Sequence, residues 1–256
     1  LEMSGGADAG LFGVIGRGGI VRDFTLAGFG ATTSTGTVGL LAGVNAGRVV
    51  NVGATGTLKS TNNANAIAGG LVGENRGRIE QSWASVNIDG AVTTGRLAGK
   101  NDGRIVQSYA TGFGTTSAQR TNGGLVGANN GVIVQSYANE RLTVGALIGG
   151  LVGSNVGRIR ESYADSTLTT SAGAQAGGLA GANRGRIASK VFWNRESSGA
   201  TTGVGAGTAM RASSGLTDAQ MSVPASFGPS WDFSAHSVWN MPEGYLAPVL
   251  RWSGAF

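Results

Sequence analysis

A short pattern of apolar and polar positions recurs six times along the chain. Each copy runs from a leucine through a Gly-x-Asn-x-Gly string to a valine or isoleucine. The spacings are 30, 26, 28, 26 and 28 residues, measured between the asparagines Asn45, Asn75, Asn101, Asn129, Asn155 and Asn183. A period of this size indicates a repeat architecture, in which one unit can bury its apolar face only against its neighbours.

Two further β-favouring stretches follow most copies. The second stretch carries an isoleucine, a serine and an aromatic residue, and it recurs at 79–84, 105–110, 133–138 and 159–164. The third stretch is variable, as at 86–89 and 141–144. Glycine or asparagine separates the pieces, and no stretch before residue 215 has the 3.6-residue period of a helix. Three short strands per repeat describe one coil of a β-solenoid.

The sequence therefore predicts an all-β fold: a right-handed parallel β-helix (β-solenoid) of about seven coils, formed by residues 1–190. The count includes a degenerate first copy near 11–20, which has Ile15 at the asparagine position. Neighbouring coils lie about 4.8 Å apart, so equivalent residues stack in columns. We expect one column of leucines, one of valine and isoleucine, and an aromatic column made of Trp83, Tyr109, Tyr137 and Tyr163.

The six repeat asparagines should form a structural ladder. Asparagine tolerates the left-handed backbone of a tight corner, and its amide can hydrogen-bond to the amides above and below it. The flanking glycines would supply corners that leave no room for a Cβ atom. Ordinary loop residues would not recur six times in one register, so the recurrence favours a ladder.

The glutamines of the second stretch leave two alternatives open. Strict alternation from Ile79 would place Gln81 and Trp83 on the same face, and a buried glutamine needs hydrogen-bond partners. Either Gln81, Gln107 and Gln135 form a second amide ladder, or the strand bends between the isoleucine and the aromatic residue.

Residues 191–256 do not continue the repeat. They hold four of the five tryptophans, the only histidine (His236) and all four prolines. A solenoid exposes an open edge at each end and needs a cap there. We expect this segment to be an aromatic-rich cap packed on the solenoid, with Thr217 as the N-cap of a short helix at 216–221.

Composition narrows the chemistry. The chain has no cysteine, which excludes disulfides and thiolate zinc sites. With one histidine and 14 scattered acidic residues, we expect no nucleophilic triad, no metal site and no cofactor. The net charge of +5 favours anionic partners. We expect no membrane insertion, because no apolar run approaches the roughly 18 residues that span a bilayer, and no motif supports nucleic-acid binding.

A carbohydrate-cleaving site needs two carboxylates about 5–10 Å apart. The columns on either side of the repeat asparagine contain no two stacked acids. Neighbouring coils instead place opposite charges together, in the pairs Glu74–Lys100 and Arg76–Asp102. Only Glu140 and Asp165 could approach each other, on the variable stretch. The sequence thus argues against an enzyme.

Arginine follows the second glycine of most repeats. The position is occupied by Val132 in one copy and by five arginines in the others: Arg48, Arg78, Arg104, Arg158 and Arg186. Stacked coils would bring these guanidinium groups into a stripe. Such a stripe could be an anion track that binds acidic carbohydrate, or a solvated edge that prevents sideways pairing of strands. The second interpretation is the simpler one, and both remain open.

The string Gly-Gly-Leu-Val-Gly-x-Asn-x-Gly-x-Ile-x-x-Ser-Tyr-Ala resembles the GLUG motif of large bacterial surface and secreted proteins, including filamentous-haemagglutinin-like adhesins. Residues 124–138 and 150–164 match it best, and the resemblance extends over about 38–252. The first copy departs from the motif at Ile15, and the last has Lys190 and Val191 in place of Ser-Tyr. The motif is specific for structure and has no assigned chemistry.

The resemblance implies a non-enzymatic structural or binding segment of a secreted bacterial surface adhesin. Its partner would be carbohydrate or protein on a host or in a biofilm. The segment would be monomeric and part of a longer polypeptide. The alternative is a polysaccharide-degrading β-helix enzyme, either a lyase or a glycosidase, which would need acids of adjacent coils in one groove.

Overall fold

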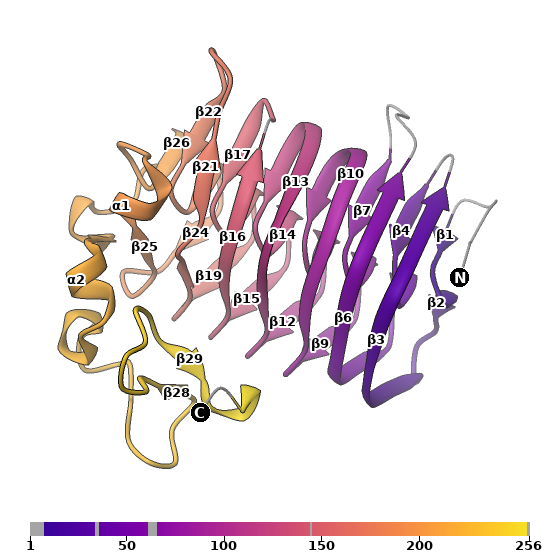
Figure 1. Ribbon diagram of the computed structural model, residues 1–256, viewed down its shortest axis with the longest axis horizontal. Helices are drawn as coiled ribbons and strands as arrows, with labels where there is room; N and C mark the ends of the chain where they lie inside the picture. Colours follow the sequence, from indigo (N-terminus) through magenta and orange to yellow (C-terminus); the bar gives the residue numbers. More distant parts are fainter. Residues whose placement is uncertain (1–7, 34–35, 61–65, 144, 255–256) are drawn as a thin grey trace.

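The chain folds as a stack of parallel β-coils, as the repeats predict (Figure 1). The computed structural model describes residues 8–33, 36–60, 66–143 and 145–254, and it is 54% strand and 8% helix. About six turns follow one another, and strands pair in parallel with their counterparts in the next coil. The prediction of an all-β solenoid is therefore confirmed.

The first stretch of every repeat lies in an eight-stranded parallel sheet. Its strands are β2 (Phe12–Ile15), β5 (Ala42–Asn45), β8 (Val72–Asn75), β11 (Ala98–Asn101), β14 (Val126–Asn129), β18 (Val152–Asn155), β23 (Ala180–Asn183) and β26 (Val204–Gly207). Six of the eight end at the repeat asparagine. The degenerate first copy is in register with the others, because Ile15 pairs with Asn45.

The second and third stretches belong to a 19-stranded sheet. Its first ten strands are β1 (Asp8–Ala9), β3 (Ile20–Thr33), β4 (Thr37–Gly39), β6 (Arg48–Ser60), β7 (Ile67–Gly69), β9 (Arg78–Glu80), β10 (Trp83–Gly95), β12 (Arg104–Val106), β13 (Tyr109–Gly123) and β15 (Val132–Val134). The others are β16 (Tyr137–Thr143), β17 (Leu147–Gly149), β19 (Arg158–Arg160), β20 (Tyr163–Ala164), β21 (Thr167–Thr169), β22 (Gln175–Gly177), β24 (Arg186–Ile187), β25 (Phe192–Asn194) and β27 (Gly215–Leu216).

The apolar columns fill the interior of the stack. The leucine column is fully buried at Leu41, Leu71, Leu97, Leu125, Leu151 and Leu179. The β-branched column is fully buried from Val49 to Ile159, and Ile187 in the last regular coil is partly buried. Full burial of one such side chain stabilises a fold by about 1.5–3 kcal/mol. Each column is completed only by neighbouring coils, so stacking provides the core.

The stack continues beyond residue 190, the boundary expected from the repeats. Phe192 pairs with Tyr163, and Val204 pairs with Ala180. Phe192 thereby supplies the last rung of the aromatic column, which the departure at Lys190 and Val191 had made uncertain. The first helix, α1 (Arg195–Ser198), lies in this last, irregular coil.

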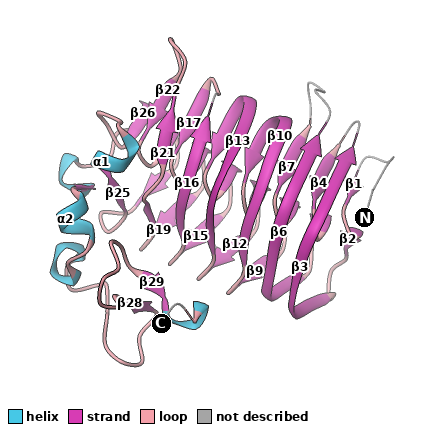
Figure 2. Cartoon of the chain, viewed as in Figure 1, coloured by secondary structure: helices cyan, strands magenta, loops and turns pink. Residues whose placement is uncertain are grey.

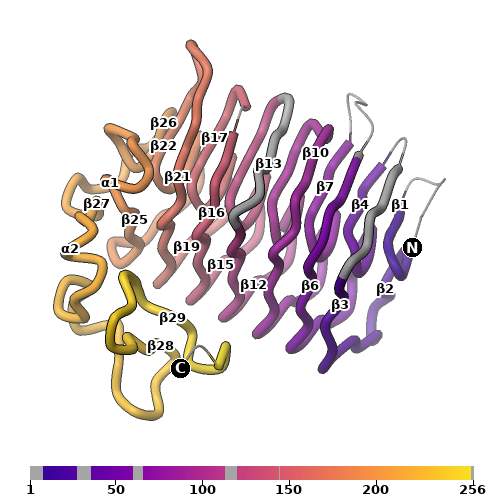
Figure 3. The backbone as a smooth tube through the Cα atoms, viewed as in Figure 1, coloured from indigo at the N-terminus to yellow at the C-terminus, as the bar shows by residue number. Residues whose placement is uncertain are grey.

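The rest of the tail folds back along the flank of the stack (Figure 3). It contains η1 (Ala212–Ser214), α2 (Asp218–Met221), η2 (Pro224–Phe227), β28 (Trp239–Asn240), β29 (Val249–Leu250) and η3 (Arg251–Ser253). Among the described residues, helices occur only in the last coil and in this tail, and Thr217 forms the expected N-cap of α2 (Figure 2). The indole of Trp252 donates to the carbonyl of Gln107 at 2.8 Å and contacts the ring of Tyr109. The tail therefore covers a side wall as well as the last coil.

Candidate functional site

The repeat asparagines form one continuous hydrogen-bonded ladder inside the stack. Each Nδ2 donates to the Oδ1 of the asparagine in the next coil at 2.7–2.8 Å, from Asn45 to Asn183. Asn183 ends the series by donating to the carbonyl of Thr208 at 2.9 Å. All six side chains are buried. The ladder is confirmed as a structural feature, and its amides are occupied with one another.

The expected left-handed backbone at these asparagines is wrong. None of them has a positive φ. The left-handed corner lies in the second stretch instead, at Asp23, Asn51, Gln81, Gln107, Gln135 and Glu161, with φ between 43° and 64°. These six residues stack as one column, so the bend occurs at the same place in successive coils.

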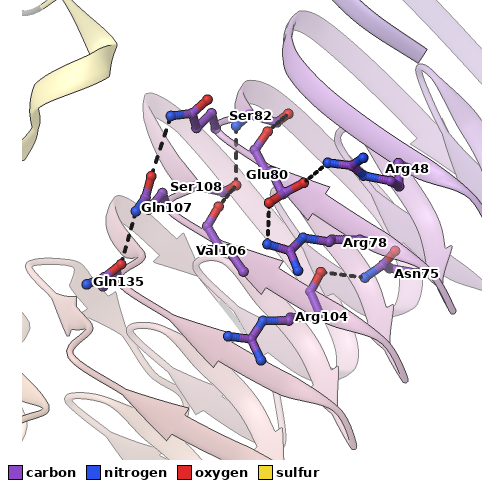
Figure 4. Close-up of polar contacts among 11 residues, drawn as sticks. Arg48, Asn75, Arg78, Glu80, Ser82, Arg104, Val106, Gln107, Ser108 and Gln135 are labelled. Atoms are coloured by element: carbon purple, nitrogen blue, oxygen red, sulfur yellow. Dashed lines mark hydrogen bonds and ion pairs between the residues drawn. The ribbon is translucent and has the colours of Figure 1, made fainter. Parts of the chain in front are cut away.

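Both predictions for the glutamines are correct, because the bend and the amide ladder occur together. The strand bends at each glutamine, and the amides still form a ladder along the bend (Figure 4). Gln107 donates to Gln135 at 3.1 Å, and Gln135 donates to the carboxylate of Glu161 at 2.8 Å. Because the bend turns the glutamine away from the aromatic residue, the amide is half-buried instead of fully buried.

A buried serine ladder beside this corner was missed. Backbone N–H groups donate to the Oγ of the serine in the next coil, as from Ser82 to Ser108 at 3.2 Å. The Ser108 Oγ in turn donates to the carbonyl of Val106 at 2.9 Å (Figure 4). Ser136 and Ser162 repeat the arrangement. The recurrence of serine in the repeat could have revealed it.

The arginine column (Arg48, Arg78, Arg104, Arg158 and Arg186) stacks in register as predicted. Its members pair directly from coil to coil, with Val132 between Arg104 and Arg158. The side chains lie on the outer wall, and the valine or isoleucine that follows each of them points inward. Figure 4 shows the first three arginines on neighbouring coils.

One carboxylate, that of Glu80, pairs with two arginines in the N-terminal half of the arginine column. Glu80 lies two residues after Arg78 in β9, on the same face of the strand. It accepts a hydrogen bond from Arg48 at 2.8 Å and forms an ion pair with Arg78 (Figure 4). Partial burial would raise the pKa of Glu80, but the hydrogen bonds from the two guanidinium groups outweigh it and lower that pKa.

The C-terminal half has no such carboxylate. Two further arginines, one in β19 and one after the repeat asparagine, lie beside its last two members. Together they form the arginine cluster: Arg158, Arg160, Arg184 and Arg186. All four are exposed, and none has an ion-pair partner within the described part of the chain. The same sequence period thus gives one half in which a carboxylate pairs with two arginines and another half whose arginines have no such partner in the described residues.

Two shallow grooves border the arginine cluster. One has a volume of about 530 Å³, and its lining includes Asn130, Val132, Val156, Arg158 and Arg186. The other, of about 340 Å³, lies on the opposite side of Val156 and includes Arg184. Val156 is 60% exposed. The surface therefore combines guanidinium donors with an apolar ridge.

The charged residues beside the asparagine ladder form a compact neutral network. Lys100 contacts Glu74 at 2.9 Å, as the sequence predicts, and also Asp102 at 2.6 Å. Arg76 pairs with Glu74 at 2.6 Å, not with Asp102 as expected. The hydrogen bond to Asp102 raises the pKa of Lys100. With two acids and two bases, this surface offers no excess charge for a ligand.

A buried ion pair inside the stack was not predicted from the sequence. Arg96 Nε and Glu140 Oε2 are 2.5 Å apart, and both side chains are almost completely buried. Arg96 replaces a glycine that other repeats carry before the column leucine. Its guanidinium fits beside Gly112, where a Cβ atom would lie 2.5 Å from Nη1. The break in the glycine column at Arg96 was the available signal.

Glu140 and Asp165 do not face each other. Glu140 and its core neighbour Ala138 point into the stack, and Glu140 N–H donates to Ser166 Oγ at 3.2 Å. Asp165, on the next coil, has the opposite orientation and accepts hydrogen bonds from Asn194 and Ser197. Burial raises the pKa of both carboxyl groups, and Arg96 opposes the rise at Glu140. One acid points into the stack and the other points outward, so the two cannot act on one substrate.

No group of three or more His, Asp or Glu side chains that could hold a metal ion occurs in the described residues. Within the same part of the chain, no helix has the length and apolar character that a bilayer crossing requires. Comparison with known protein families, curated proteins and solved structures finds no match. The GLUG resemblance therefore stays a prediction.

Proposed function

We propose that this chain is a non-enzymatic binding segment of a secreted bacterial surface adhesin and that its arginine cluster holds acidic carbohydrate. The observation that carries the proposal is the group of four exposed guanidinium groups without a carboxylate partner in the described residues. Guanidinium groups bind carboxylate and sulfate through paired, charge-assisted hydrogen bonds. A polymer of acidic sugars would meet several of them along adjacent coils.

The apolar ridge supports carbohydrate over other anions. Sugar rings carry C–H faces as well as charged groups, so they pack against aliphatic side chains. Val132 and Val156 lie in the grooves beside Arg158 and Arg186 and supply such contacts. A simple inorganic anion would make no use of them.

The adhesin setting is supported by the repeat and by the scaffold. The GLUG-like string occurs in bacterial surface proteins, and a stacked solenoid is a rigid wall whose columns repeat at a fixed spacing. The non-enzymatic assignment is supported by Glu140 and Asp165, which lie on opposite faces of their strands. The other acids near the arginines, such as Glu80 and Asp102, are engaged in ion pairs.

The test compares two double variants from the same column. Arg158→Ala/Arg186→Ala removes two members of the arginine cluster, and Arg48→Ala/Arg78→Ala removes the two that pair with Glu80. Both double variants lower the net charge of the protein by the same amount. Binding of heparin and of polygalacturonate is measured by calorimetry, with dextran as the neutral polymer. We expect about a tenfold loss of affinity for the first variant and less than about threefold for the second.

Equal losses in the two variants would show that net charge, not the arginine cluster, determines binding. Retained affinity in Arg158→Ala/Arg186→Ala would reject the site. The wild-type protein is also incubated with each polymer, and new reducing ends and unsaturated uronates are followed. Product formation above background would reject the non-enzymatic assignment.

A further inference from the structure

A second concave site lies at the C-terminal end of the stack. It has a volume of about 630 Å³ and is built by the last coil, from β25, α1 and the segment that leads to β27. Its lining includes Trp193, Arg195, Thr201, Met210 and Arg211. Pockets of about 300–1,000 Å³ are typical of small-molecule sites. The arginine cluster contributes none of its residues.

The floor of this cavity is an indole that closes the apolar core. Trp193 follows a column of alanines that ends at Ala164, with which it pairs. It is 5% exposed. Gly178, Gly203 and Gly215 surround the ring, and a Cβ atom at each would lie within 3 Å of it. The glycines hold the indole in a fixed slot.

The indole N–H of Trp193 has no hydrogen-bond acceptor among the described residues, although the atom is buried. The indoles of Trp231 and Trp252 have acceptors, the carbonyls of Lys190 and Gln107. The buried indole of Trp239 also lacks one in the described part of the chain, but Trp239 is not among the residues that line this cavity. A buried donor without an acceptor has lost its hydrogen bond to water and gained none in the protein, which is unfavourable. Unsatisfied buried donors are rare in folded proteins, and this one borders a cavity.

The position of this N–H points to a ligand. Nε1 lies 2.6 Å from where a Cβ atom of Gly203 would stand and 3.3 Å from that position at Gly215, and both glycines line the cavity. Met210 Sδ lies at the same wall. A methionine side chain adapts readily, so a ligand that displaces it would reach the indole N–H.

The charged residues at the rim of the cavity favour an anionic ligand. Arg195 and Arg211 are exposed and have no ion-pair partner in the described residues. The one lining acid, Glu196, already accepts a hydrogen bond from the backbone of Asp218 at 2.7 Å. The cavity thus offers an aromatic floor, a buried N–H donor and two guanidinium groups at its mouth.

We propose that this cavity binds an acidic sugar unit, either a free uronate or the end residue of an acidic oligosaccharide. The ring would pack on Trp193 and Met210, a ring or hydroxyl oxygen would accept from the indole N–H, and the carboxylate would meet Arg211. The site is separate from the arginine cluster, so either proposal can fail without the other.

The test uses the whole chain labelled with ¹⁵N, because the indole N–H of Trp193 then reports on its own hydrogen bond. Glucuronate and trigalacturonate are titrated as probes, with glucose as the neutral control. We expect a saturable downfield shift of the Trp193 indole resonance with both acids. Arg211→Ala should weaken binding about fivefold or more, and Arg158→Ala/Arg186→Ala should leave it unchanged.

Trp193→Phe separates a binding role from a packing role. Phenylalanine keeps an aromatic floor and removes the unpaired donor, so a purely structural role predicts unchanged or higher stability and no effect on calorimetric binding. The proposal predicts loss of uronate binding with stability retained. Trp252→Phe, which removes an N–H that already has an acceptor, is the matched control. An unresponsive Trp193 resonance, an equal response to glucose, or full affinity in Arg211→Ala would overturn the proposal.

Discussion

The asparagine ladder and the arginine column both recur once per coil and lie three residues apart in the sequence. They differ in how the side chains of neighbouring coils interact. The asparagines are buried, and each amide donates to one neighbour and accepts from the other. The arginines are on the outer wall, and each guanidinium can only donate. Identical neighbours therefore attract in the first column and repel in the second. The sequence period reveals stacking, while the environment decides whether stacking is cohesive.

The outer wall tolerates repulsion because water and ions screen it, over about 8 Å at physiological ionic strength. Glu80 and Val132 further divide the arginine column. Inside the stack no water or ions screen the interaction between charges, so a buried charge needs a directly bonded partner of opposite charge. Arg96 and Glu140 meet that condition within one pair. The comparison predicts that substitutions inside the stack cost stability and that those outside change binding.

The largest effect is expected for Glu140→Val. The substitution leaves the guanidinium of Arg96 buried without its carboxylate, which costs about 3–5 kcal/mol of the free energy of unfolding. The double variant Arg96→Gly/Glu140→Val restores the glycine found in other repeats and should recover much of that loss. Urea denaturation followed by circular dichroism measures both. If the double variant is less stable than Glu140→Val, the pair is not the source of the loss.

A smaller effect is expected for Asn101→Ala in the middle of the asparagine ladder. It removes the nearest acceptor of the Asn75 Nδ2, which keeps only long contacts with the carbonyls of Gly77 and Arg104 at 3.5 and 3.4 Å, and it removes the donor to the Oδ1 of Asn129. A buried polar group that loses its partner costs about 1–3 kcal/mol. We expect a total loss of about 2–5 kcal/mol in the same denaturation experiment. The control is Asn130→Ala, an exposed neighbour that should change stability by less than about 0.5 kcal/mol. Similar losses in both variants would contradict the role of the ladder.

The ladder and the core columns could be predicted from the sequence because each is one residue type at one period. Glu80 could have been found as well, since residues two apart in a strand share a face. The Arg96–Glu140 pair could not, because it joins residues 44 positions apart and depends on the space beside Gly112. The tail has no repeat, so neither its packing on the flank nor the cavity beside Trp193 follows from a period.

The third prediction concerns the outer wall. Glu80→Gln removes the carboxylate shared by Arg48 and Arg78, so the N-terminal half of the arginine column gains one net positive charge. The exposed ion pairs contribute little stability, and we expect a loss below about 1 kcal/mol. Heparin affinity should rise about two- to fivefold in calorimetry at low salt. An unchanged affinity would show that these two arginines do not reach the polymer.

The smallest effect is a pH dependence that comes from the same carboxylate. The pKa of Glu80 is lowered in the folded state by Arg48 and Arg78. Its contribution to stability is therefore complete above the ordinary glutamate pKa of about 4.3 and is lost as the pH falls through the lowered value. Protonation frees both arginines, and sulfate groups of heparin stay ionised at that pH. Acidification should thus raise the heparin affinity of the wild type more than that of Glu80→Gln.

The ratio of the two affinities isolates Glu80, because the other carboxyl groups titrate in both proteins. At neutral pH the variant should bind about two- to fivefold more tightly, and at a pH below the Glu80 pKa the two proteins should bind equally. Circular dichroism at each pH confirms that both remain folded. A ratio that stays constant from neutral to acidic pH would mean that Glu80 does not control the N-terminal half of the arginine column, and the contrast between its two halves would need another cause.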